Sequence, residues 1–155
     1  MFDILPPALK SVAVRTKVRY APHPYVWMAP ARAMPTGLGI ATEGKELPLE
    51  ALPEWSEDRI KVLPMVWKNP VTGGLHYQVH PCGVLALEVA PLPAGATKTE
   101  ETLYPDGATL TDLKEIRELV YKMQRPGIAP PVSLLLISPL FVFDMTHQSA
   151  ARRLT

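Results

Sequence analysis

The sequence lacks the features that mark several broad classes of protein. It has one cysteine, Cys82, which excludes an intrachain disulfide and is typical of a reducing compartment. The net charge of +1 at pH 7 gives no basic excess for binding nucleic acid. The longest apolar run, residues 132–143, contains Pro139 and is shorter than the ~20 residues that span a bilayer. The first residues show no secretory signal. We therefore expect a cytoplasmic protein that binds neither nucleic acid nor membrane.

Proline, in contrast, is abundant. There are 18 prolines in 155 residues, about twice the usual ~5%. This favours short strands joined by shaped loops over long helices. The length fits a single domain with a core of reasonable size.

The clearest local pattern is a β-hairpin centred on residues 67–76. Residues 62–67 are apolar and rich in β-formers, and residues 75–80 alternate strictly. The alternation places Leu75, Tyr77 and Val79 on one face of a strand and His76, Gln78 and His80 on the other. Asn69-Pro70 and Gly73-Gly74 between the two arms are turn signals. The pattern predicts a hairpin with a loop of four to six residues.

Other segments carry simpler signals. Apolar spacing predicts a helix over residues 3–18 and another that starts near Thr109, with Asp112 completing a variant capping box, and stops at Pro126-Gly127. Residues 82–89 read as a strand and residues 91–106 as a loop. The acidic stretch 41–60 is predicted to be a solvated connection.

Residues 65–73, Met-Val-Trp-Lys-Asn-Pro-Val-Thr-Gly, are followed by a strand and resemble the mid-domain hairpin of the taurine dioxygenase-like (TauD/TfdA) family. The wider match runs from the Tyr-Ala-Pro-His-Pro-Tyr of residues 20–25 to the Gln-Arg-Pro-Gly of residues 124–127. It is most similar to the fungal branch that includes the xanthine dioxygenases.

The resemblance implies an α+β, mainly β fold: a partial double-stranded β-helix (the jelly roll of clavaminate synthase-like enzymes) with two flanking helices. Residues 1–130 would be the middle portion of such an oxygenase domain, and residues 131–155 a divergent tail, first apolar and then polar. For the full-length family it implies Fe(II) and 2-oxoglutarate as cofactors, and hydroxylation of a small molecule, with xanthine as one candidate.

The metal site of that family is not visible in the sequence. A facial triad needs two histidines and one carboxylate, and in this family one histidine and the carboxylate form a His-x-Asp/Glu pair. None of His23, His76, His80 and His147 is followed two residues later by a carboxylate. His147 is the one candidate for the distal metal ligand, although it lies only three residues after Asp144. We therefore expect no cofactor on this chain.

Substrate-binding candidates are His76, Gln78, His80 and Cys82. The polar strand face could line a cavity or be plain solvent-exposed surface. On a strand, His76 and His80 would lie ~13 Å apart, too far to share an ion. Cys82 could be a nucleophile partnered by His80 or a buried structural thiol.

Three functional hypotheses follow. The first is a catalytically silent fragment of an Fe(II)/2-oxoglutarate-dependent dioxygenase. The second is a binding or assembly protein, for example a homo-oligomer, that uses an open sheet edge and an apolar sheet face. The third is a self-contained enzyme that uses His80 and Cys82.

Overall fold

The computed structural model describes residues 2–32, 34–35 and 40–128. These residues form three helices, six strands and four short 3-10 turns. The helices are α1 (Pro7–Arg15), α2 (Pro24–Trp27) and α3 (Leu113–Ile128). The strands are β1 (Thr16–Tyr20), β2 (Val62–Pro64), β3 (Val66–Lys68), β4 (Leu75–Tyr77), β5 (Val84–Val89) and β6 (Ala108–Leu110). The 3-10 turns are η1 (Phe2–Ile4), η2 (Leu49–Ala51), η3 (Glu57–Arg59) and η4 (Pro81–Gly83). No described helix is long and apolar enough to cross a membrane.

The main sheet has four antiparallel strands in the order β2-β1-β5-β6. Val18 at the centre of β1 lies opposite Leu63 on one side and Leu87 on the other. The register between β1 and β5 shifts between Arg19 and Tyr20. A separate two-stranded sheet pairs β3 with β4. The described residues are thus mixed α+β with open antiparallel sheets, in line with the α+β part of the expected fold.

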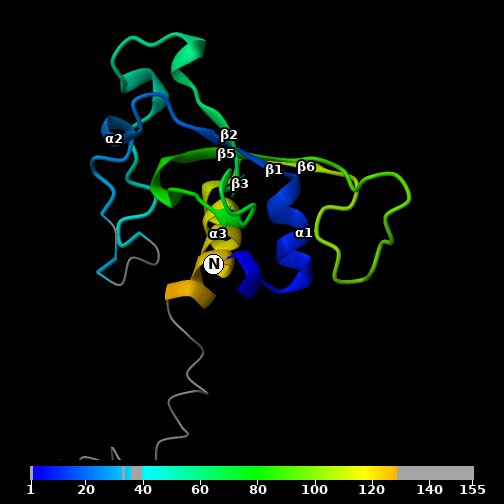
Figure 1. Ribbon diagram of the computed structural model, residues 1–155. Coiled ribbons are helices and arrows are strands. Elements are labelled where there is room, and N and C mark those ends of the chain that lie inside the picture. The colour runs from blue at the N-terminus through cyan, green and yellow to red at the C-terminus, as the bar shows by residue number, and fades with distance from the viewer. Residues whose placement is uncertain (1, 33, 36–39, 129–155) are drawn as a thin grey trace, which may run out of the picture.

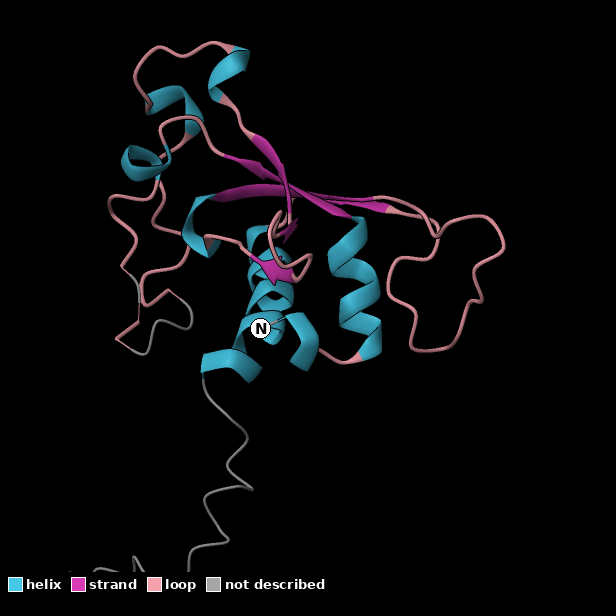
Figure 2. Cartoon of the chain, in the orientation of Figure 1, coloured by secondary structure: helices cyan, strands magenta, loops and turns pink. Residues whose placement is uncertain are grey.

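Helices α1 and α3 cover the same face of the main sheet (Figure 1). The apolar core lies between these layers, and its sheet side includes Val18 and Leu87, both fully buried. α3 contributes an apolar stripe at helical spacing, namely Ile116, Leu119, Val120 and Met123. No described helix lies over the opposite face where β1, β5 and β6 meet (Figure 2).

The predicted helix over residues 3–18 is wrong at both ends. α1 begins at Pro7, and its C-terminal turn gives way at Thr16 to strand β1. The Thr16 hydroxyl donates a hydrogen bond to the Val12 carbonyl and closes the helix end. Pairing with two neighbouring strands outweighs the helical periodicity of residues 16–18, because it buries Val18 fully in the sheet while the backbone stays hydrogen-bonded.

The hairpin prediction is confirmed, with a six-residue loop between β3 and β4. Asn69 shapes this loop, since its side-chain oxygen accepts hydrogen bonds from the backbone N–H groups of Val71 and Thr72. Gly73 adopts φ +70°, which requires glycine there for an unstrained turn.

The apolar arm before the hairpin is divided between two sheets. The fully buried Met65 lies between β2 and β3. Its N–H donates to the Thr16 carbonyl in the main sheet, whereas its carbonyl accepts from the Gln78 N–H beside the hairpin. Residues 62–67 are therefore not one continuous strand.

The helix predicted near Thr109 exists but begins later. Thr109 lies in β6, and the side chain of Asp112 caps α3 by accepting the Glu115 N–H at 2.8 Å. The helix continues through Pro126 to Ile128. The predicted stop at Pro126-Gly127 is therefore wrong by two residues, since the helix ends at Ile128.

We expect two leucines to differ clearly in how much they stabilise the folded protein. Replacing the fully buried Leu87 by alanine should cost about 2–5 kcal/mol, because it opens a cavity against α3. Replacing Leu75, which is 37% exposed in the hairpin, by alanine should lower the free energy of unfolding far less. Urea unfolding of both variants measures the two losses. Equal losses would show that the core does not lie between the main sheet and its helices.

Candidate functional site

The predicted substrate-binding residues do not continue along one strand. β4 ends at Tyr77, so His76 lies on the strand whereas Gln78 and His80 lie in the irregular segment that follows. All three are exposed, and Cys82 in η4 is partly buried. His76 sits opposite Trp67 in the hairpin. The prediction that these residues bind substrate stays a prediction.

His80 is held by two tyrosines. Its backbone N–H donates to the Tyr20 hydroxyl at 3.3 Å, and its ring meets the Tyr25 ring edge-on with centroids 6.5 Å apart. Burial raises the pKa of the Tyr20 hydroxyl, and the contact with the His80 backbone partly offsets this. These contacts position the chain at the entry to η4.

Cys82 has the environment of an inert thiol. Burial raises its pKa, and the nearby Arg117 only partly opposes that effect. The reactive form of a cysteine is the thiolate, which a raised pKa disfavours. The electrostatics therefore favour the structural role over the nucleophilic one.

Metal ligands do not converge in the part of the chain that the structure describes. No group of three or more histidine, cysteine, aspartate or glutamate side chains there could hold an ion. His147 lies outside the described residues, as does the whole tail 131–155. The described residues therefore do not fit an iron site.

A buried ion pair is the strongest electrostatic feature of the described residues. The side chain of Arg117 on α3 is 1% exposed, and its guanidinium donates to the Glu46 carboxylate, which is 6% exposed. Glu43 lies 3.5 Å from the same guanidinium but is 37% exposed. The pair fastens residues 43–46 to the middle of α3.

The polar stripe around this pair is incompletely satisfied. Arg117, Tyr121 and Gln124 follow one another on α3 at spacings of four and three residues. The Arg117 Nε, the Tyr121 hydroxyl and the Gln124 Oε1 are buried and have no hydrogen-bond partner among the described residues. Burial raises the pKa of Tyr121 to about 12, although Arg117 lowers it.

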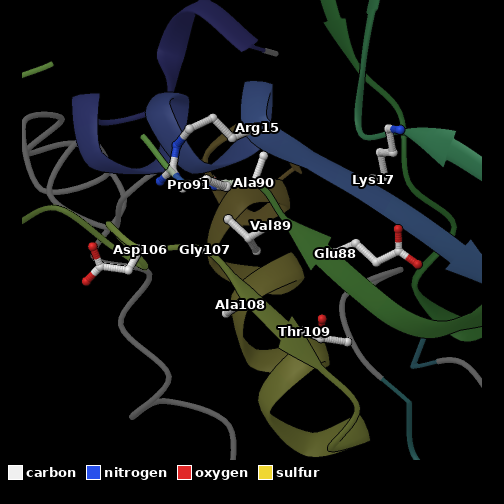
Figure 3. Close-up of a pocket in the computed structure, with 10 residues that line it drawn as sticks. All are labelled: Arg15, Lys17, Glu88, Val89, Ala90, Pro91, Asp106, Gly107, Ala108 and Thr109. Atoms are coloured by element: carbon white, nitrogen blue, oxygen red, sulfur yellow. The ribbon is translucent and has the colours of Figure 1, made fainter. Parts of the chain in front are cut away.

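A hollow of about 460 Å³ lies on the face of the main sheet away from α3 (Figure 3). Its floor carries a cross-strand row of polar side chains, with Lys17 on β1, Glu88 on β5 and Thr109 on β6. Its rim includes Arg15 and Asp106. The guanidinium of Arg15 donates to the carbonyls of Ala90, Leu103 and Tyr104, so it serves as a backbone clamp.

The chain is similar in sequence to several known proteins. No protein-family model and no solved structure matches it. Three fungal proteins match over 84% of the chain, each described as an alpha-ketoglutarate-dependent xanthine dioxygenase. They come from Neurospora crassa (52% identity over 130 residues), Emericella nidulans (45% over 130 residues) and Schizosaccharomyces pombe (42% over 132 residues).

The chain is homologous to part of the fungal alpha-ketoglutarate-dependent xanthine dioxygenases. It spans between 27% and 31% of the length of these relatives. The similarity also extends to an alpha-ketoglutarate-dependent dioxygenase of Phomopsis amygdali, at 35% identity over 133 residues. The resemblance to the fungal xanthine dioxygenase branch is therefore confirmed, and it concerns one portion of the dioxygenase chain.

Sequence reasoning missed the buried pair. The acidic stretch 41–60 was expected to be solvated, and this is wrong for Glu46. The available signal was Arg117, which stands directly beside the apolar positions Ile116 and Val120 of the helix. A cation at that place on the helix implies a buried carboxylate partner, but does not say which one.

Breaking the ion pair should destabilise the protein strongly. Glu46→Gln leaves the Arg117 charge buried and should cost about 3–5 kcal/mol, as measured by urea unfolding. Glu43→Gln should cost about 1 kcal/mol or less, because that carboxylate is partly solvated. The double variant Arg117→Met, Glu46→Leu should recover most of the loss. If Glu43→Gln costs as much as Glu46→Gln, the pair is not the main contact.

We expect the ionisation of Tyr121 to lower the stability of the protein in alkali. Its folded-state pKa of about 12 exceeds the ordinary value of 10.0. Between these values the unfolded chain has lost the proton that the folded chain keeps, so the free energy of unfolding falls as pH rises. Tyr121→Phe should make this decline shallower in unfolding curves recorded from about pH 9 to 12, the range in which the two states bind different numbers of protons. A decline as steep in Tyr121→Phe as in the parent chain would contradict the assignment.

Proposed function

We propose that this chain forms the middle portion of an alpha-ketoglutarate-dependent dioxygenase domain and has no oxygenase activity by itself. The observation that carries the proposal is the 52% identity over 130 residues to the Neurospora crassa xanthine dioxygenase, of which the match covers 27%. Identity at this level over an entire structural unit supports a shared fold for the matched portion.

The arrangement of layers supports a double-stranded β-helix as the parent fold. In such a fold, helices pack on the outside of one sheet, and the other face of that sheet is turned towards the interior. Here α1 and α3 cover one face of the main sheet (Figure 1), and the row Lys17, Glu88 and Thr109 occupies the other (Figure 3). The described sheet would thus supply part of one wall of the β-helix.

The chemistry of the complete enzyme would be the hydroxylation of a small molecule coupled to decarboxylation of alpha-ketoglutarate. Xanthine, which is named for the relatives, is the first substrate to test. Iron supplies the activation of dioxygen when it is bound in enzymes of this kind. No His-x-Asp/Glu pair occurs anywhere in this sequence, which supports the proposal that this chain alone is silent.

The alternative is a binding or assembly protein that pairs through a sheet edge, for example as a homo-oligomer. Exposed apolar side chains on the hairpin favour it, chiefly Trp67 (43% exposed) and Val71 (91% exposed). The open face of the main sheet does not favour it, because the row along that face is charged and not apolar. Size-exclusion chromatography at several concentrations separates the two functions: a monomer at all concentrations removes the homo-oligomer.

A graft in cis tests the proposed function. The 130 matched residues of the Neurospora crassa dioxygenase are replaced by the corresponding residues of this chain. The graft should keep xanthine-dependent decarboxylation of alpha-ketoglutarate within about tenfold, or ~1.4 kcal/mol in barrier. This chain alone should give none.

A Leu87→Ala version of the graft serves as the control, and it should lose activity together with stability. A folded graft with no activity, or turnover by the isolated chain, would contradict the proposal.

A further inference from the structure

Among residues 2–32, 34–35 and 40–128, only segments at one end cover the face of the main sheet opposite α1 and α3. Near η2 and α2, Leu85 packs with Trp27 and Leu52 in a second apolar cluster. Arg19 on β1 pairs with Glu57 on η3 at 3.5 Å. Beyond this point the hollow floored by Lys17, Glu88 and Thr109 lies open. We call this region the helix-free face.

The charges on the helix-free face are of both signs. Lys17 is exposed and stands directly opposite the half-buried Glu88 in the β1–β5 register, but the two form no ion pair. Asp106 at the rim is already bound to Lys98 at 2.7 Å. An occupant that offers one cationic and one anionic group would therefore match the face.

The two edges of the main sheet differ in their capacity to bind a strand. The Lys61 carbonyl and the Met65 N–H both point from β2 towards the β1 side, so Val62 and Pro64 point outwards by alternation. Pro64 has no N–H to donate, and this blocks a continuous ladder at β2. A new strand is therefore disfavoured at this edge.

No strand from the described part of the chain pairs with the outer edge of β6. The Ala90 N–H donates to the Arg15 carbonyl beside β1, so Val89 and Leu87 bond towards β6. Their partners Ala108 and Leu110 face inwards, which leaves the N–H and carbonyl of Thr109 facing outwards. The helix-free face and the β6 edge adjoin at Thr109, so both can contact one occupant.

The relatives indicate what that occupant is. About 70% of each fungal dioxygenase lies outside the segment that matches this chain. We propose that the helix-free face binds polypeptide from this remaining part of the dioxygenase, and that Lys17 and Glu88 form ion pairs with it. This inference depends on the proposed function, because it names the partner of the same structural unit.

Chemical labelling of single cysteines tests the proposal. Lys17→Cys is introduced into the isolated chain and into the cis graft, and its alkylation rate is measured by peptide mass spectrometry. The thiol should react rapidly in the isolated chain and at least about tenfold more slowly in the graft, where it is covered. Lys122→Cys, on an exposed position of α3, should react at the same rate in both.

Each outcome decides between specific alternatives. Rapid labelling of Lys17→Cys in an active graft overturns the docking proposal and leaves the proposed function intact. An inactive graft that folds overturns the proposed function instead. Slow labelling in the isolated chain that becomes slower with concentration overturns the proposal in favour of a second copy on the face.

Charge reversal gives an independent measurement. In the active graft, Lys17→Glu should lower the midpoint of thermal inactivation, whereas Lys122→Glu should not. In the isolated chain, Lys17→Glu should lower the unfolding midpoint only slightly, through repulsion from Glu88 opposite it, and by less than in the graft. If Lys17→Glu has no effect on the graft, the face does not bind charged groups there and the proposal is overturned.

Discussion

The antiparallel pairing of β1 with β5 is the constraint on which the rest of the structure depends. β1 follows α1 without a loop, so the position of this strand also fixes the helix. Val18 and Leu87 meet across the pair and are both fully buried. At the junction, Arg15 donates hydrogen bonds to the carbonyl of Ala90 before the 91–107 loop and to the carbonyls of Leu103 and Tyr104 within it, and so fastens that loop to the sheet.

This pairing makes the sheet one-sided. α1 precedes β1 and α3 follows β6, and both helices pack on the same face of the sheet (Figure 1). A single apolar core therefore serves both helices. The opposite face carries Lys17 and Glu88 (Figure 3), which neither α1 nor α3 covers. A core that is complete on one side and a polar face on the other is the organisation expected of one wall of a larger β-fold. The homology to a portion of the fungal dioxygenases agrees with this organisation.

Local chemistry made the hairpin and α3 predictable, since turn residues and an apolar stripe act over a few positions. β1 could not be recognised, because residues 16–18 fit a helical stripe, and only pairing with strands more than 40 residues away decides their conformation. Glu46 was missed for the same reason: its partner is 71 residues distant. The alternation at His76, Gln78 and His80 runs past the end of β4. Gln78 still bonds Met65 in the register of the hairpin, and the regular pairing ends before Pro81 opens η4. The alternation is thus present in the sequence, but the strand ends before the alternation does.

The central proposal is that this chain, although homologous to part of the dioxygenases, does not by itself bind the iron and alpha-ketoglutarate that such an enzyme uses. Anaerobic titration of the isolated chain with Fe(II) in the presence of alpha-ketoglutarate, followed by visible absorption, measures this directly. The account predicts no metal-to-ligand charge-transfer band at any iron concentration. A saturable band at one iron per chain would contradict it.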